Sequence, residues 1–358
     1  MIDPALPKVL RGWARMGMQS GMRTVSPLLF WAGMLLLGAG LVVNSLWQQI
    51  APQPTLLLAE LALGSAIAAF LIRFVLRCTF ATALMVVWLI ALVCFAGVAP
   101  SAAAVLISLA ALGLGSFFVP SNSAAGAALS LLAGFAVICG IDGWLLPFMI
   151  HTRIAYVMLL LIIVAVRWQP ILGLLRSTWS GWTSVVSEAP RWCSLTIVLV
   201  GAVSINAWLP SMLYDTMVYH LALQSQVVHL GYYQMNVGTS LWALAPWAAD
   251  ILQAVGWIVA GAEARGAINV LWFVAALMLL WELCRELGLA PMLRWLGVAM
   301  YATIPSIAYT LAAMQTEGPT GAVILALALL IQRTNKPTGR LLLLVALLLG
   351  LLMELKIS

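Results

Sequence analysis

Long apolar runs separated by short polar connections make up almost the whole chain. A run of about 20 apolar residues is the length that crosses a bilayer as a helix. Eleven runs approach or reach this length, and they cover residues 26–47, 55–76, 79–98, 102–119, 124–141, 147–166, 192–208, 266–283, 292–308, 318–331 and 341 onward. The pattern therefore predicts an all-α, polytopic transmembrane helix bundle with about 11 spans.

The first and last runs carry further information. Residues 26–47 are too long for the core of a signal peptide, and no small-residue cleavage site follows them, so we expect an uncleaved first helix. The last run has about 15 residues before Lys356, which is roughly 22 Å of helix against a hydrocarbon core of about 30 Å. We therefore expect the sequence to be a piece of a longer protein or a truncated product.

Composition excludes an ordinary soluble protein. The chain has 17 Lys and Arg and 11 Asp and Glu, so 8% of its residues are charged, whereas soluble domains have roughly 25%. Hydrophobic residues make up 64%, and the mean hydropathy is +1.08. The five cysteines lie far apart in apolar stretches, which indicates neither a disulfide framework nor a zinc site.

The basic residues indicate an orientation. With the N-terminus in the cytoplasm, all but three of the 17 Lys and Arg fall on the cytoplasmic side, as the positive-inside rule requires; the exceptions are Arg153, Arg265 and Lys356. The net charge of +6 is then a consequence of topology, and it indicates no nucleic-acid partner. Residues 246–261 are apolar enough to cross, but a span there would move the later bases outward. We expect an interfacial or re-entrant helix instead.

The same runs divide the chain into three parts. Residues 1–25 form a basic cytoplasmic N-terminus, and residues 26–190 form a six-helix transmembrane extension. Residues 191–358 form a second bundle with a long outer loop at 209–262. The predicted location is a plasma membrane, with membrane lipid around a multi-pass chain.

The few acids on the predicted outer side are candidates for chemistry: Asp142, Asp215, Asp250, Glu263 and Glu317. Residues 213–221 are the densest in reactive side chains. If this stretch is helical, Asp215 and Tyr219 share one face, while His220 and Gln224 share another. A single substrate touches both faces only where it wraps the end of the helix. The alternative is that Asp215 merely begins a helix in a solvated loop.

Glu317 is the second candidate, at the outer mouth of the run that follows it. A carboxylate at the membrane surface is costly to keep without a partner or a function. The alternative is that Thr316 and Glu317 cap the next helix, because acids favour helix N-termini. The chain has no phosphate-binding loop, dinucleotide fingerprint or nucleophile elbow, so its sequence gives no support to nucleotide hydrolysis or hydrolase chemistry.

Several weak motifs follow one another from residue 192 to the end of the chain. They are Asn206-Ala207-Trp208-Leu209-Pro210 at a helix end, Asp215 with Tyr219-His220-Leu221, a turn at Gly231, an apolar segment from Pro246, then Asn269, Ile304-Pro305, Thr316-Glu317 and a helix ending in Glu354-Leu355-Lys356. This order resembles the GT-C superfamily of membrane glycosyltransferases, which includes the protein mannosyltransferase and lipid A aminoarabinose transferase groups. For the fold, the resemblance implies a partial GT-C-like core at 191–358. Two positions differ from the family pattern: Thr216 follows Asp215 where many members have a second acid, and Glu317 stands where Asp is commoner.

For function, the resemblance implies a glycosyltransferase of the bacterial inner membrane. Such an enzyme moves a sugar from a polyprenyl-phosphate donor to an envelope glycan, lipid or protein acceptor at the outer, periplasmic face. The resemblance implies that Asp215 acts as a general base or helps to hold a metal, and that Glu317 is the acid of the second outer loop. A divalent metal ion is therefore left open as a cofactor, with unknown ligands.

The chemistry itself indicates further residues. An acceptor hydroxyl loses a proton as it attacks the anomeric carbon, and the leaving phosphate needs cationic or hydrogen-bonding partners. We expect His220, Arg265 and Lys356 to meet the phosphate, although Lys356 is equally well explained as an interfacial anchor. We expect Tyr219 and Gln224 to contact substrate beside them.

Two other functions fit the same sequence. One is a polytopic transporter or flippase for a lipid-linked substrate, although transporters tend to have charges near the membrane midplane. The other is a catalytically incomplete fragment that serves as an assembly subunit.

Overall fold

The structure is a computed structural model. It describes residues 32, 35, 36, 39, 43, 52–119, 125–208, 211, 213–234, 236–238, 248–314, 316–333 and 338–355. The chain divides into two compact units, Met1–Leu63 and Gly64–Ser358, and the site described below lies in the second unit. The N-terminal bases and Lys356 lie outside the described residues. The predicted helix at 26–47 lies almost entirely outside them.

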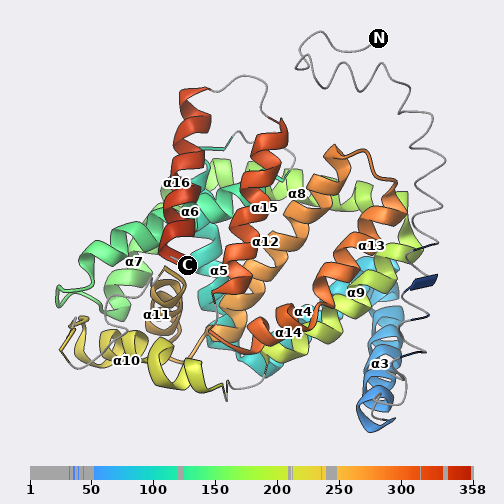
Figure 1. Cartoon of the computed structure of the whole chain (residues 1–358), viewed down its shortest axis with the longest axis horizontal. Coiled ribbons are helices and arrows are strands. Elements are labelled where there is room, and N and C mark those ends of the chain that lie inside the picture. The colour runs from blue at the N-terminus through green and yellow to red at the C-terminus, as the bar shows by residue number, and fades with distance from the viewer. Residues whose placement is uncertain are drawn as a thin grey trace. The chain divides into compact units, whose positions relative to one another are not determined.

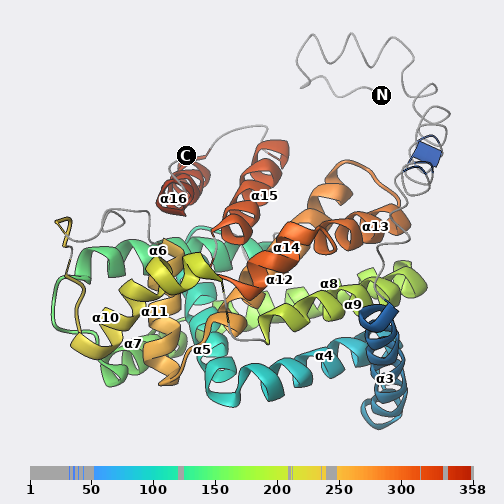
Figure 2. The ribbon, with the colours of Figure 1, turned by 60° about the horizontal axis from the view of Figure 1, so that its bottom comes forward.

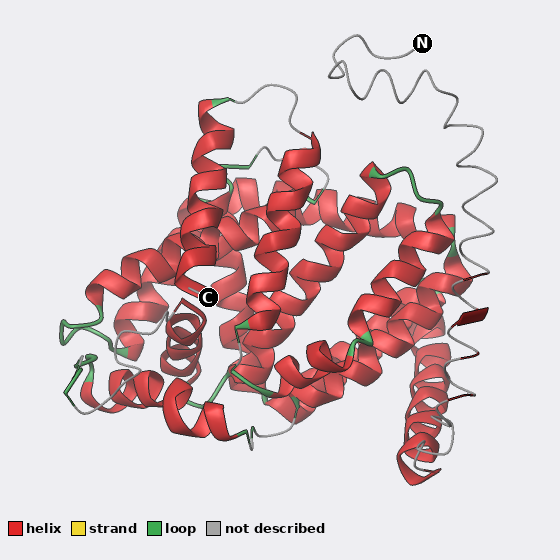
Figure 3. Cartoon of the chain, in the orientation of Figure 1, coloured by secondary structure: helices red, strands yellow, loops and turns green. Residues whose placement is uncertain are grey.

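The described part of the chain is helical, without a strand, as predicted (Figure 3). Its elements are α3 (Pro52–Leu76), α4 (Phe80–Ala96), α5 (Val98–Gly115), α6 (Gly126–Leu145), α7 (Arg153–Val166), α8 (Trp168–Glu188), α9 (Pro190–Ser204), η2 (Ile205–Ala207), η3 (Thr216–His220), α10 (Leu221–Leu230), α11 (Ala248–Ala260), α12 (Arg265–Glu286), α13 (Pro291–Ala302), α14 (Pro305–Ala312), α15 (Glu317–Arg333) and α16 (Gly339–Leu355) (Figure 1).

Among the described residues, five helices are long and apolar enough to cross a membrane, or up to seven if each bent pair counts as one span. The bent pairs are α7 with α8, at 75°, and α13 with α14, at 56°. The second bend lies directly before Pro305, because a residue that precedes proline is disfavoured in the helical region. The structure thus supports a membrane protein, while the count of 11 spans stays a prediction.

Helices α5 and α6 pack closely, because two glycines let their backbones meet. A Cβ on Gly115 would collide with the carbonyl of Ser130, and one on Gly134 would collide with the carbonyl of Ala111. Small residues at such contacts are the usual means by which membrane helices approach each other. The pair forms one wall of the main core.

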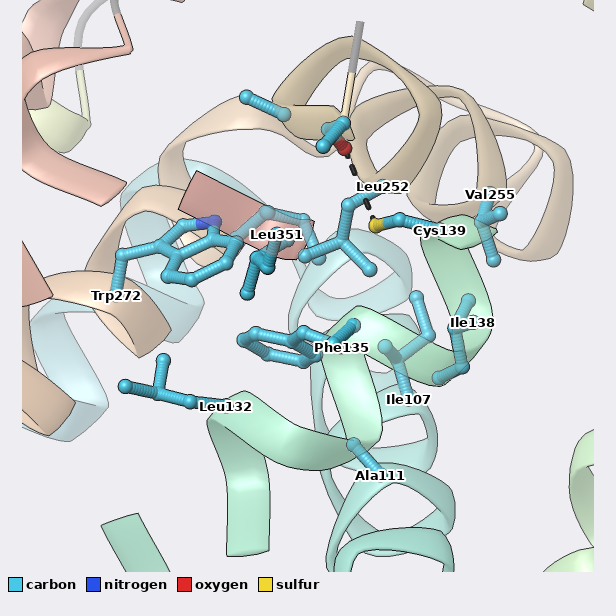
Figure 4. Packing of buried hydrophobic residues seen from close by; sticks show 14 of the residues in the cluster. Ile107, Ala111, Leu132, Phe135, Ile138, Cys139, Leu252, Val255, Trp272 and Leu351 are labelled. Carbon is cyan, nitrogen blue, oxygen red and sulfur yellow. Dashed lines mark hydrogen bonds between the residues drawn. The ribbon is translucent and has the colours of Figure 1, made fainter. Parts of the chain in front are cut away.

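Helices α11 and α12 extend this core from the second half of the chain (Figure 2), together with residues of α10, α15 and α16. Figure 4 shows Phe135 of α6 against Trp272 of α12, with ring centroids 4.7 Å apart. In the same view the Cys139 thiol donates to the carbonyl oxygen of Ala248, at 3.2 Å, where α11 begins. Residues from both sides of the predicted boundary between 190 and 191 therefore share one core. A division into domains at this point stays a prediction.

Helix α8 occupies a stretch in which the apolar runs predicted no element. Its buried side, with Ile171, Leu174 and Val186, packs across the ends of other helices. Near its C-terminal end, the Trp182 indole donates to the hydroxyl of Thr82 at 3.0 Å. The helix is amphipathic, so a search for uninterrupted apolar runs does not find it.

Five bases assigned to the cytoplasmic side lie at one end of the helices, called the basic end below: Arg167, Arg285, Arg294, Arg333 and Arg340. There Arg333 of α15 pairs with Glu286 of α12 at 2.8 Å, and Arg340 donates to the carbonyl oxygen of Ser116 at 3.1 Å. This gathering fits the positive-inside interpretation. The side of the membrane that the basic end faces stays a prediction.

Candidate functional site

The candidate site begins at η3, a π-helical turn that continues directly into α10. Such turns are rare and recur at functional sites, because the extra residue changes the direction of the side chains. Here Thr216, His220 and Gln224 are buried, while Asp215 is exposed and Tyr219 is half-buried. The structure therefore gives the expected two-sided segment, with Asp215 toward solvent and His220 toward the core.

His220 forms a buried pair with Asp250 in the first turn of α11. Its Nδ1 lies 2.9 and 3.0 Å from the two carboxylate oxygens, and the side chains are 6% and 1% exposed. Burial raises the pKa of the Asp250 carboxyl to about 6, while the hydrogen bond and charge of His220 act in the opposite direction. We call this pair the His220–Asp250 dyad. Sequence reasoning counted Asp250 among the outer acids but gave it no role.

The connection between α14 and α15 packs against the same segment. The backbone N–H of Met314 donates to the hydroxyl of Thr216 at 3.2 Å. The amide of Gln224 donates to the sulfur of Met314 at 3.0 Å and lies 3.4 Å from the His220 carbonyl oxygen. Glu317 follows three residues later, exposed in the first turn of α15. The structure thereby places the two outer connections predicted to hold the site in direct contact.

Tyr219 lies within the electrostatic influence of three carboxylates. Burial raises the pKa of its hydroxyl, and the negative charges of Asp215, Asp250 and Glu317 raise it further. The Tyr219 ring also packs on the ring of His220, with centroids 4.2 Å apart. Asp215 and Glu317, taken from two different connections, thus act on one hydroxyl group.

Arg265 lies at the start of α12 and is 2% exposed. Its Nη1 donates to the carbonyl oxygens of Leu311 and Ala312, at 3.3 and 2.7 Å, and its Nε lies 3.5 Å from a Glu263 carboxylate oxygen. The guanidinium therefore binds the C-terminal end of α14, where a positive charge is favourable. The predicted contact of Arg265 with phosphate stays a prediction.

Asn269 supports the same helix end one turn further along α12. Its amide donates to the carbonyl oxygens of Thr310, Leu311 and Ala313, the last at 2.6 Å, and its own oxygen accepts from Gln253 at 2.9 Å. Together, Asn269 and Arg265 hold the backbone of residues 310–313, which leads to Met314 and Glu317.

The described residues include no group of three or more His, Cys, Asp and Glu side chains with the spacing of a metal site. In this arrangement Asp215, Asp250 and Glu317 therefore do not form a set of metal ligands. The metal ion that the resemblance left open stays a prediction, with no ligands assigned.

A second buried polar cluster lies beside the site; its acid, Asp142, was among the candidates for chemistry, but its partners were not predicted. The Tyr156 hydroxyl of α7 lies 2.8 Å from a carboxylate oxygen of Asp142 and 2.6 Å from Nδ1 of His151. His151 Nε2 reaches the Leu145 carbonyl oxygen at 3.0 Å. These residues are dispersed along an apolar stretch, so no local motif marks them.

This second cluster is tied to the first through the backbone after α10. The N–H of His151 donates to the Gly231 carbonyl oxygen at 3.2 Å, and the N–H of Tyr233 donates to the Leu146 carbonyl oxygen at 2.7 Å. Burial raises the pKa of the Tyr233 hydroxyl, and the charge of Asp250 raises it further. Tyr233 therefore stands between the two clusters.

Comparison with protein families, curated proteins and solved structures gives no match. The resemblance to GT-C glycosyltransferases accordingly rests on the order of residues in the sequence, and the site on its own geometry.

Proposed function

We propose that the chain transfers a sugar from a polyprenyl-phosphate donor to an acceptor hydroxyl at the outer face of a bacterial inner membrane. The observation that carries the proposal is the contact between the segments that hold Asp215 and Glu317, made by the hydrogen bond from the Met314 N–H to the Thr216 hydroxyl at 3.2 Å. It puts the two acids expected to be catalytic in one region, at the end of the helices opposite the basic end.

In the proposed reaction Asp215 takes the proton of the acceptor hydroxyl as the oxygen attacks the anomeric carbon. An exposed carboxylate is open to an acceptor from the aqueous side. Glu317 holds a second negative charge near the sugar, where positive charge develops at the anomeric centre in the transition state. Tyr219 and Gln224 contact the substrate in this proposal.

The test uses the full chain in proteoliposomes with radiolabelled polyprenyl-phosphate mannose or aminoarabinose and an envelope fraction as acceptor. We expect Asp215→Asn to lower transfer by a factor of about 10² to 10⁴, the range for loss of a general base. Glu188→Gln, a carboxylate at the basic end, is the matched control and should leave the rate unchanged. Transfer by the Asp215→Asn variant at the normal rate contradicts the mechanism.

A transporter for a lipid-linked substrate is the second candidate, because both bent helix pairs resemble the broken helices of transporters. It predicts movement of the labelled donor across the bilayer without a covalent product. The same proteoliposomes answer this question when labelled donor is placed on one side only.

A further inference from the structure

The leaving group of the proposed reaction is a phosphate, and it needs a positively charged or hydrogen-bonding partner in the site. A polyprenyl phosphate gains negative charge as it departs, and such charge is stabilised by positioned hydrogen-bond donors or cations. The groups around Tyr219 are three carboxylates, Asp215, Asp250 and Glu317. A phosphate therefore needs a positive partner among its neighbours, and the following inference rests on the proposed function for that reason.

Both arginines at this end of the described helices are engaged with helix ends. Arg265 donates to the carbonyl oxygens of Leu311 and Ala312 at the end of α14. Arg153 donates from Nε to the Val259 carbonyl oxygen at 3.0 Å, near the end of α11. Each arginine neutralises the negative end of a helix.

His220 is differently placed. The hydrogen bonds to Asp250 use Nδ1, and among the described residues none is formed by Nε2. A carboxylate on Nδ1 fixes the ring orientation and leaves Nε2 as the atom that can meet a ligand, to which it donates when both ring nitrogens carry hydrogen. Asp250 is itself held in the first turn of α11 within the main core, so the direction of Nε2 is set by packing.

The titratable groups near His220 are carboxylates and tyrosines, and none of those named here is a base. Its own segment contributes Asp215 and Tyr219, α11 contributes Asp250, and the segment after α10 contributes Tyr233 close to Asp250. Glu317, from the start of α15, acts on Tyr219. Both tyrosines are neutral at pH 7, because burial and the carboxylates raise the pKa of each hydroxyl.

We propose that Asp250 is a positioning residue that holds His220 so that Nε2–H binds the phosphate of the departing polyprenyl phosphate. As the acceptor oxygen bonds to the anomeric carbon, the bond from that carbon to the phosphate oxygen breaks. Its electron pair stays on the phosphate, and the acceptor proton passes to Asp215. The new phosphate charge is met by the Nε2–H donor, which keeps its proton.

The first experiment uses the unsubstituted chain and its three histidines. Diethyl pyrocarbonate modifies accessible neutral imidazoles, and mass spectrometry of peptides locates the modification. We expect polyprenyl phosphate to protect His220, polyprenol of the same length to give no protection, and exposed His229 to react equally in every sample. Protection by both lipids assigns the effect to the isoprenoid tail and overturns the proposal, as does protection by neither.

The second experiment measures binding of polyprenyl phosphate and polyprenol to the chain in nanodiscs. Loss of a charge-assisted hydrogen bond weakens binding by about tenfold or more, so His220→Gln should reduce phosphate affinity to the level of the alcohol. Asp250→Asn should weaken phosphate binding less and leave polyprenol binding unchanged, because the Asn oxygen still accepts a hydrogen bond from Nδ1 but carries no charge to hold the ring in place. His229→Gln is the matched control. Undiminished phosphate binding by His220→Gln overturns the proposal.

The two proposals fail separately. If His220 binds polyprenyl phosphate but no sugar is transferred, the proposed function falls and the phosphate site stands. If sugar is transferred and His220→Gln leaves both phosphate binding and the rate of transfer unchanged, the phosphate site falls and the proposed function stands.

Discussion

The backbone N–H of Met314 donates to the hydroxyl of Thr216, across 98 residues of sequence. This bond joins the segment that carries Asp215 to the connection that carries Glu317. Because both groups are buried, neither has water as a substitute partner.

Thr216→Val should therefore destabilise the protein by about 1 to 3 kcal/mol, since it leaves the Met314 N–H buried without an acceptor. The measurement is thermal unfolding in detergent, together with the transfer rate. Thr183→Val removes an exposed hydroxyl that bonds only within its own helix, at 2.8 Å, and serves as the control. Equal stability of the two variants would show that the bond between the connections is not formed.

The pH dependence of stability should include a contribution from Asp250, which lies in a helix outside the candidate spans. Burial raises its pKa from 3.8 to about 6 in the folded chain. Between these values the folded state binds more protons than the unfolded state, so this group makes stability fall as pH rises from about 4 to 6. Unfolding curves should show that Asp250→Asn lacks this decline. A variant that follows the unsubstituted chain through the whole range contradicts the assignment.

Tyr156→Phe should cost roughly 2 to 4 kcal/mol, because one hydroxyl serves both Asp142 and His151. The free energy of unfolding in denaturant is the measurement. Tyr309→Phe, at a side chain that is half exposed, should change stability little. If the two phenylalanine variants are equally stable, the second polar cluster contributes nothing measurable.

Gly266→Ala should be strongly destabilising, by about 3 kcal/mol or more, because the new methyl group would collide with the carbonyl of Ala207. Gly173→Ala is the matched substitution on α8, where nothing lies within 4 Å of the added Cβ. It should stabilise the helix by about 0.5 to 1 kcal/mol. Melting temperatures that move in the same direction would contradict the close approach of α12 to η2.

The helical fold and several of its elements were predictable, because an apolar run can be recognised from local sequence alone. The runs at 55–76 and 266–283 correspond closely to α3 and α12. The prediction missed α8 because its apolar residues occupy one side of a helix that also contains many serines and threonines. It also took residues 292–308 as one run, whereas the chain bends ahead of Pro305.

The site was predictable to a lesser degree, and the reason is physical. Asp215 and Glu317 stood out because charge is scarce in this sequence, and the segments that carry them meet at the hydrogen bond between Met314 and Thr216. The partner of His220 did not stand out, because Asp250 lies 30 residues away and only folding sets that distance. Likewise the bonds of Arg265 to the end of α14 depend on packing that sequence spacing does not specify.

The contact between Cys139 and the first turn of α11 has a consequence for biosynthesis. Its two partners are separated by 109 residues, so α6 enters the membrane well before the ribosome has made α11 and α12. Until those helices arrive, the face of α6 that carries Phe135 has no protein partner from them and is covered by lipid or by the insertion machinery. Assembly of the candidate site is therefore a late event in synthesis, because it follows the emergence of α11 and α12 from the ribosome.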